Sequence, residues 1–61
     1  MATKLTAKEV SIVSDLLTYE EAAIKKAKLY SKTITDQSVS GAFSRIQENH
    51  KKRFDDLLNL L

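Results

Sequence analysis

Apolar residues recur every three or four positions through two long stretches of this 61-residue chain. That spacing places them on one face of a helix with 3.6 residues per turn. The chain has no proline and a single glycine, Gly41, so neither stretch contains a strong helix breaker. The pattern predicts an all-α protein with two helices. Their periodic apolar positions are Val10, Val13, Leu16, Leu17, Ala23, Ile24, Ala27 and Tyr30, then Val39, Phe43, Ile46, Phe54, Leu57 and Leu61.

The sequence also marks where each helix should begin. Thr6-Ala7-Lys8-Glu9 is a capping box, in which the threonine and glutamate side chains each accept a hydrogen bond from the other residue's backbone N–H. Asp36 is the natural N-cap of the second helix, although Thr33 or Thr35 could serve. We therefore expect a single domain over residues 1–61, with a helix at about 6–32, a turn at about 33–36 and a helix at about 37–60.

A turn this short makes the two helices antiparallel neighbours, which form a helical hairpin. Each apolar stripe covers nearly half of its helix, which is wider than a two-helix seam can cover. The sequence therefore predicts a homodimer, in which two hairpins pack face to face as a four-helix bundle with a two-fold interface. The residues expected in the dimer core are Val13, Leu17, Ile24, Phe43, Ile46, Phe54 and Leu57.

Composition narrows the functional classes. Without cysteine, neither a disulfide nor a zinc–thiolate site can form. No run of about eighteen apolar residues could cross a bilayer, and no signal peptide is evident, so we expect an intracellular protein without membrane contact. A net charge of +2 and a pI near 9.0 give little support to nucleic-acid binding, and Lys51 and Lys52 are better explained as a solvated face.

Two polar residues interrupt the apolar stripes. Glu20 lies at the centre of the first stripe and His50 at the centre of the second, about equally far from the turn near Thr35. An antiparallel hairpin should bring them into one layer, with Arg53 about one turn away. We interpret Glu20, His50 and Arg53 as a buried polar layer that fixes helix register. The alternative is an intersubunit metal site, in which a dimer would supply two Glu20 carboxylates and two His50 imidazoles.

Taken together, the residues resemble the spore coat protein F-like family, which belongs to the ferritin-like group. The matching segments are Leu5-Thr6-x-Lys8-Glu9, Asp15-Leu16-Leu17-x-x-Glu20-Glu21, Lys26-x-x-x-Tyr30, Asp36, Phe43-x-x-Ile46 and Leu57-Leu58. The resemblance covers nearly the whole chain. It implies a ferritin-like bundle and a structural role in the spore coat.

The resemblance also implies what a metal centre would need. Ferritin-like carboxylate proteins hold paired metals with a glutamate from the first helix of each hairpin and a Glu-x-x-His pair from the second. Glu20 matches the first-helix glutamate, with Glu21 as the neighbouring candidate. The second helix departs from the motif: the pair is Gln47 and His50 in one register, and His50 and Arg53 in the other. Neither register contains an intact Glu-x-x-His, so we expect no di-iron centre.

No nucleophile–base set or glycine-rich phosphate loop is evident, so the sequence predicts neither an enzyme nor a bound cofactor. The expected function is that of a small structural or assembly protein, related to the spore coat and to sporulation. It would act through self-association and through contacts with other coat or assembly proteins, in the cytoplasm or the spore coat. The alternative is a metal-binding ferritin-like bundle with an intersubunit Glu20/His50 site.

Overall fold

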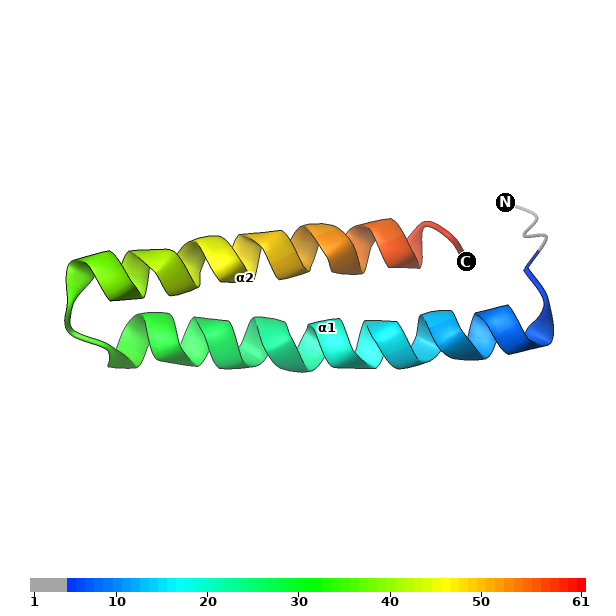
Figure 1. Ribbon diagram of the computed structural model, residues 1–61, viewed down its shortest axis with the longest axis horizontal. Coiled ribbons are helices and arrows are strands. Elements are labelled where there is room, and N and C mark those ends of the chain that lie inside the picture. The colour runs from blue at the N-terminus through cyan, green and yellow to red at the C-terminus, as the bar shows by residue number, and fades with distance from the viewer. Residues whose placement is uncertain (1–4) are drawn as a thin grey trace.

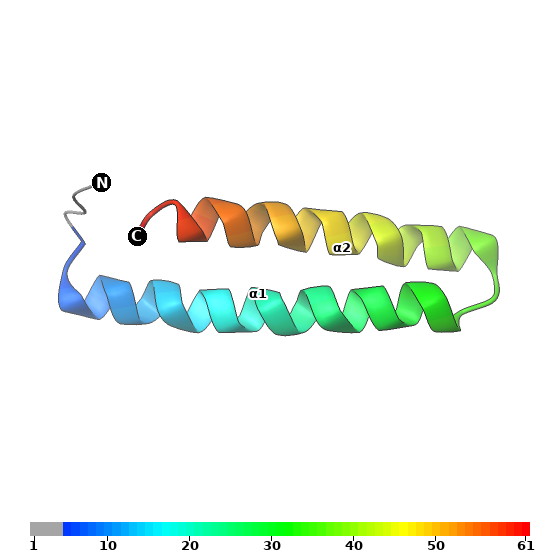
Figure 2. The same cartoon turned by 180° about the vertical axis from the view of Figure 1, so that it is seen from behind.

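The computed structural model describes residues 5–61, which form two helices and no strand. Helix α1 spans Ala7–Thr33 and helix α2 spans Gln37–Leu58. The two helices run antiparallel side by side (Figure 1), and Figure 2 shows the same pairing from behind. The predicted all-helical hairpin is therefore confirmed. Within the described residues, neither helix is both long enough and apolar enough to cross a membrane.

Helix α1 begins at the capping box that the sequence predicts. The Thr6 amide donates to Oε1 of Glu9 at 2.9 Å, and the Glu9 amide donates to Oγ1 of Thr6 at 3.1 Å. The bond from the Thr6 backbone holds the pKa of Glu9 below its ordinary value of 4.5, and the bond with the Thr6 side chain adds to this effect. The stabilisation from the Glu9 carboxylate is thus present above that ordinary value, and it is lost as the pH falls through the lowered pKa.

Residues 34–36 connect the helices. The Ile34 amide still donates to the Tyr30 carbonyl at 3.0 Å, which closes the last turn of α1. Asp36 then caps α2, because its Oδ1 accepts from the Val39 amide at 3.0 Å. Beside this turn, the rings of Tyr30 and Phe43 pack edge to face with centroids 5.3 Å apart. The caps and the ring pair together fix the closed end of the hairpin.

The seam between the helices is narrow. Val13, Glu20 and Ala27, which are seven residues apart along α1, are its buried residues, and no residue of α2 is fully buried. Of the residues expected in the dimer core, only Val13 is buried within one hairpin, and Ile46 is exposed. The others are half-buried: Leu17, Ile24, Phe43, Phe54 and Leu57. The hairpin is one helix layer thick, with Cα extents of 45 × 16 × 11 Å, so it covers only part of each apolar stripe.

Gly41 offers a direct test of local helix stability in α2. It has an ordinary helical backbone, and an added Cβ would meet only Nη1 of Arg45, at an unstrained 3.8 Å. Gly41→Ala should therefore raise the free energy of unfolding by about 0.4–1 kcal/mol, since alanine restricts the unfolded chain and favours the helix. Chemical denaturation monitored by circular dichroism measures the change. If the substitution instead lowered the free energy of unfolding, Gly41 would have to lie against a group that is not near it in this hairpin.

Candidate functional site

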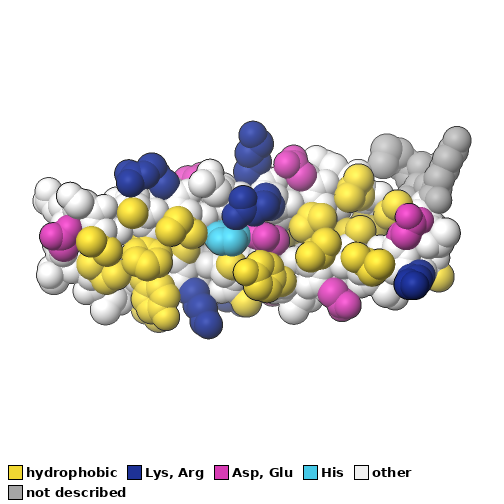
Figure 3. All heavy atoms as spheres, in the orientation of Figure 1, with side chains coloured by type: hydrophobic (Ala, Val, Ile, Leu, Met, Phe, Trp, Pro, Cys, Tyr) yellow, Lys and Arg dark blue, Asp and Glu magenta, His cyan; other side chains and the backbone are white. Residues whose placement is uncertain are grey.

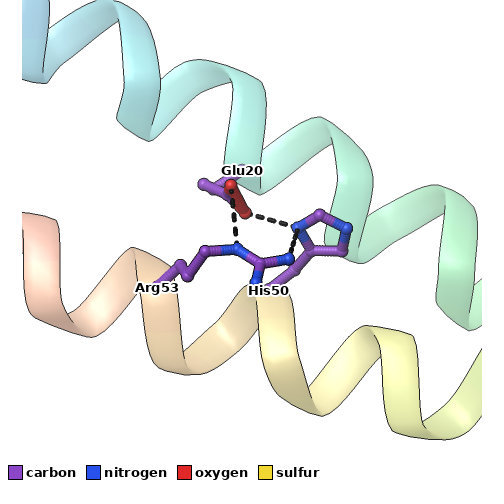
Figure 4. A network of polar contacts seen from close by, with 3 residues as sticks. All are labelled: Glu20, His50 and Arg53. Carbon is purple, nitrogen blue, oxygen red and sulfur yellow. Dashed lines mark hydrogen bonds and ion pairs between the residues drawn. The ribbon is translucent and has the colours of Figure 1, made fainter.

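The helices bring Glu20 and His50 together at mid-length of the hairpin. Glu20 lies at the middle of α1 and points toward α2, where His50 faces it (Figure 4). The Glu20 side chain is 9% exposed and that of His50 is 16% exposed. Glu20 Oε2 lies 2.5 Å from His50 Nδ1. A buried carboxylate is costly unless it is paired, and this contact supplies the pairing.

Arg53 completes the cluster from the solvent side. Its Nε lies 3.5 Å from Glu20 Oε1, and its Nη2 lies 3.2 Å from His50 Nδ1. The Arg53 side chain is 56% exposed, so it does not belong to a buried layer as the sequence suggested. The reason is helical geometry: three residues advance about 300°, which places Arg53 on the flank of α2 rather than at the seam. From this flank the long Arg53 side chain extends to the Glu20 carboxylate.

The donors and acceptors fix where a proton must lie. A carboxylate can only accept and a guanidinium can only donate, so Nδ1 of His50 cannot satisfy both neighbours at once. The shorter contact is with Glu20, and it requires a proton between Nδ1 and Oε2. Arg53 is then bound to the cluster through its ion pair with Glu20, while its Nη2 packs against the ring nitrogen. We name Glu20, His50 and Arg53 the polar cluster.

The polar cluster has the wrong chemistry for a ferritin-like metal pair. Within residues 5–61 no group of three or more His, Cys, Asp or Glu side chains lies close enough to hold a metal ion. The carboxylate that the motif requires on the second helix is replaced by Gln47 or His50, depending on register. Arg53 adds a permanent positive charge beside the two remaining donor atoms.

Glu21, the second candidate for the first-helix glutamate, does not join the polar cluster. It is exposed, and it lines a shallow groove to which both helices contribute. The apolar floor of this groove is formed by Ile24 and Phe54, and its rim carries the charged residues Glu21, Lys25, Lys51 and Asp55. Glu20 is therefore the residue that faces α2.

The hairpin also exposes a set of large apolar side chains that sequence reasoning only partly identified. Ile12 is half exposed and lies outside the apolar positions predicted from sequence, although it precedes Leu16 by four residues and so shares its side of α1. The large hydrophobic residues exposed on the two helices are Ile12, Leu16, Tyr19, Leu29, Tyr30, Val39, Ile46 and Leu58.

No protein-family model, curated protein or solved structure matches the chain.

Proposed function

We propose that this protein is a small structural protein that pairs with a second copy of itself to form an antiparallel four-helix bundle. Its function is to build a protein assembly through the surfaces of that bundle. The observation that carries the proposal is an exposed apolar face on one side of the hairpin. Figure 3 shows hydrophobic side chains gathered along both helices on this face, around the histidine of the polar cluster.

Helix geometry explains why the exposed apolar residues of α1 share one side. Each residue advances about 100° around the axis. Relative to Glu20, which points at α2, Leu16 lies about 40° to one side. Ile12, Tyr19 and Tyr30 lie about 80–100° to the same side. All four are exposed in the hairpin.

Helix α2 contributes to the same face. Relative to His50, Val39 lies about 20°, Ile46 about 40° and Arg53 about 60° to one side, in the same rotational sense as on α1. The two helices run antiparallel and face each other across the seam. Rotation in the same sense about each helix axis, followed from N-terminus to C-terminus, therefore leads to the same face of the hairpin. We name this surface the apolar face; it consists of Ile12, Leu16, Tyr19, Tyr30, Val39 and Ile46.

The other face is more charged at its centre, although Leu58 is also exposed on this side. Its central groove is rimmed by two basic and two acidic side chains, which alternate along each helix. Mixed charge of this kind keeps a surface hydrated and discourages burial. The hairpin thus exposes more large apolar side chains on one face than on the other, which favours the apolar face as the contact surface of a four-helix bundle.

A second copy is the occupant that best fits the apolar face. Contiguous apolar surface is rarely left exposed on a soluble protein, and a 61-residue chain buries too little by itself to be robustly stable. Because the polar cluster lies at mid-length, two overlapping hairpins bring their clusters together whichever way their turns point. An unrelated partner would need a matching polar group at the middle of its contact surface, whereas a second copy supplies one by symmetry.

The cellular role is proposed from the family resemblance. The segments around Thr6, Glu20, Tyr30 and Phe43 resemble the spore coat protein F-like family, which favours an assembly role in the coat. On this proposal the dimer binds other coat or assembly proteins through its outer surfaces. The metal-binding alternative is less favoured, because Arg53 already contacts both donor residues.

A pair of matched substitutions tests the apolar face. Leu16 is 44% exposed and lies on the apolar face, whereas Leu29 is 59% exposed and lies on the outer side of the same helix. Leu16→Glu should weaken the dimer at least about tenfold, or roughly 1.4 kcal/mol, because it buries an unpaired charge. Leu29→Glu should leave the dimer dissociation constant nearly unchanged. Analytical ultracentrifugation measures both constants, and equal effects of the two substitutions would argue against this face.

A further inference from the structure

We propose that the Arg53 guanidinium takes the place of a metal cation between Glu20 and His50, and that it keeps the polar cluster free of transition metals. A divalent ion bound here would use a carboxylate oxygen of Glu20 and the Nδ1 lone pair of His50. Arg53 lies against both residues: its Nε is 3.5 Å from Glu20 Oε1 and its Nη2 is 3.2 Å from His50 Nδ1. Figure 4 shows the guanidinium beside the carboxylate and the imidazole.

The chemistry of the guanidinium makes it a durable substitute. Arginine stays protonated at all accessible pH values, so its positive charge cannot be titrated away. Its charge balances that of Glu20, and the proton between Oε2 and Nδ1 occupies the lone pair that a metal would need. A metal ion would have to displace this proton to solvent and also bind beside a fixed positive charge. Both requirements oppose metal binding in the parent protein.

The inference rests in part on the proposed dimer. One hairpin offers two donor residues, Glu20 and His50, whereas two hairpins offer two carboxylates and two imidazoles. Four such donors would suit tetrahedral Zn²⁺ or Co²⁺. In that arrangement two Arg53 side chains lie beside the four donors. Removing the guanidinium should therefore create a binding site from residues that are already in place.

The test is Arg53→Gln, which removes the charge and keeps a polar side chain of intermediate length. Cobalt(II) and zinc(II) should bind this variant about 10- to 100-fold more tightly than the parent, the range over which groups around metal ligands alter affinity. The visible absorption of bound Co²⁺ measures the affinity. Because the chain has one histidine, paramagnetic shifts of a single imidazole identify His50 as a ligand. A Glu20→Gln change added to this variant should abolish the gain.

Two control variants distinguish the effect of the charge at Arg53 from a general effect of replacing an arginine. Arg45→Gln makes the same change on the outer side of α2, and it should bind no more cobalt than the parent. Arg53→Lys keeps a positive charge and should still exclude the metal. If the parent binds cobalt as tightly as Arg53→Gln, or if neither binds it, the inference is wrong. Sedimentation of the same samples reports dimer formation independently, so failure of the dimer is recognised separately.

Discussion

Glu20→Leu and His50→Leu should each lower the free energy of unfolding by about 3 kcal/mol, near the low end of the cost of stranding one member of a buried ion pair. Glu20→Leu leaves His50 Nδ1 without its acceptor and Arg53 without its ion pair. His50→Leu leaves a buried carboxylate without its closest donor. The double variant should recover much of the loss or exceed the parent, because it removes both desolvation costs and fills the seam with apolar volume.

Chemical denaturation of the four proteins gives this double-mutant cycle. The matched control is Glu21→Leu, which changes the neighbouring exposed glutamate and should alter stability by no more than about 0.5 kcal/mol. An interaction energy within about 0.3 kcal/mol of zero would mean that Glu20 and His50 are not coupled, contrary to their contact. If a chelator destabilised the parent but not the double variant, the metal-binding alternative would be preferred.

The helices and their caps could be predicted because their determinants are local. The Thr6–Glu9 box and the Asp36 cap each depend on residues three positions apart, which sequence shows directly. The ends are less sharply encoded. Helix α2 ends at Leu58 rather than near residue 60, because the amides of Leu60 and Leu61 donate to carbonyls three residues back instead of four. The last hydrogen-bonded turn of the chain is therefore tighter than an α-helical turn.

The pairing of Glu20 with His50 could be predicted because it needs only the turn position and an antiparallel arrangement. The placement of Arg53 needs more. Whether a residue on the flank of α2 is covered or exposed depends on how each helix is rotated about its axis and on what lies against the hairpin. The spacing of apolar residues in a single sequence determines neither the rotation of each helix nor what packs against the hairpin. For the same reason the sequence predicted wide apolar stripes but did not show that their exposed parts, such as Leu16 and Ile46, lie on one face.

The most direct test of the central claim is the mass of the protein in solution. Sedimentation equilibrium at micromolar concentration should give twice the 6.9 kDa mass of the chain. The thermal midpoint should rise with protein concentration, because association stabilises only the folded state. Within residues 5–61 the hairpin buries only two apolar side chains, so folding and pairing should be lost together on dilution. A well-folded species of 6.9 kDa, with a melting temperature independent of concentration, would contradict the account.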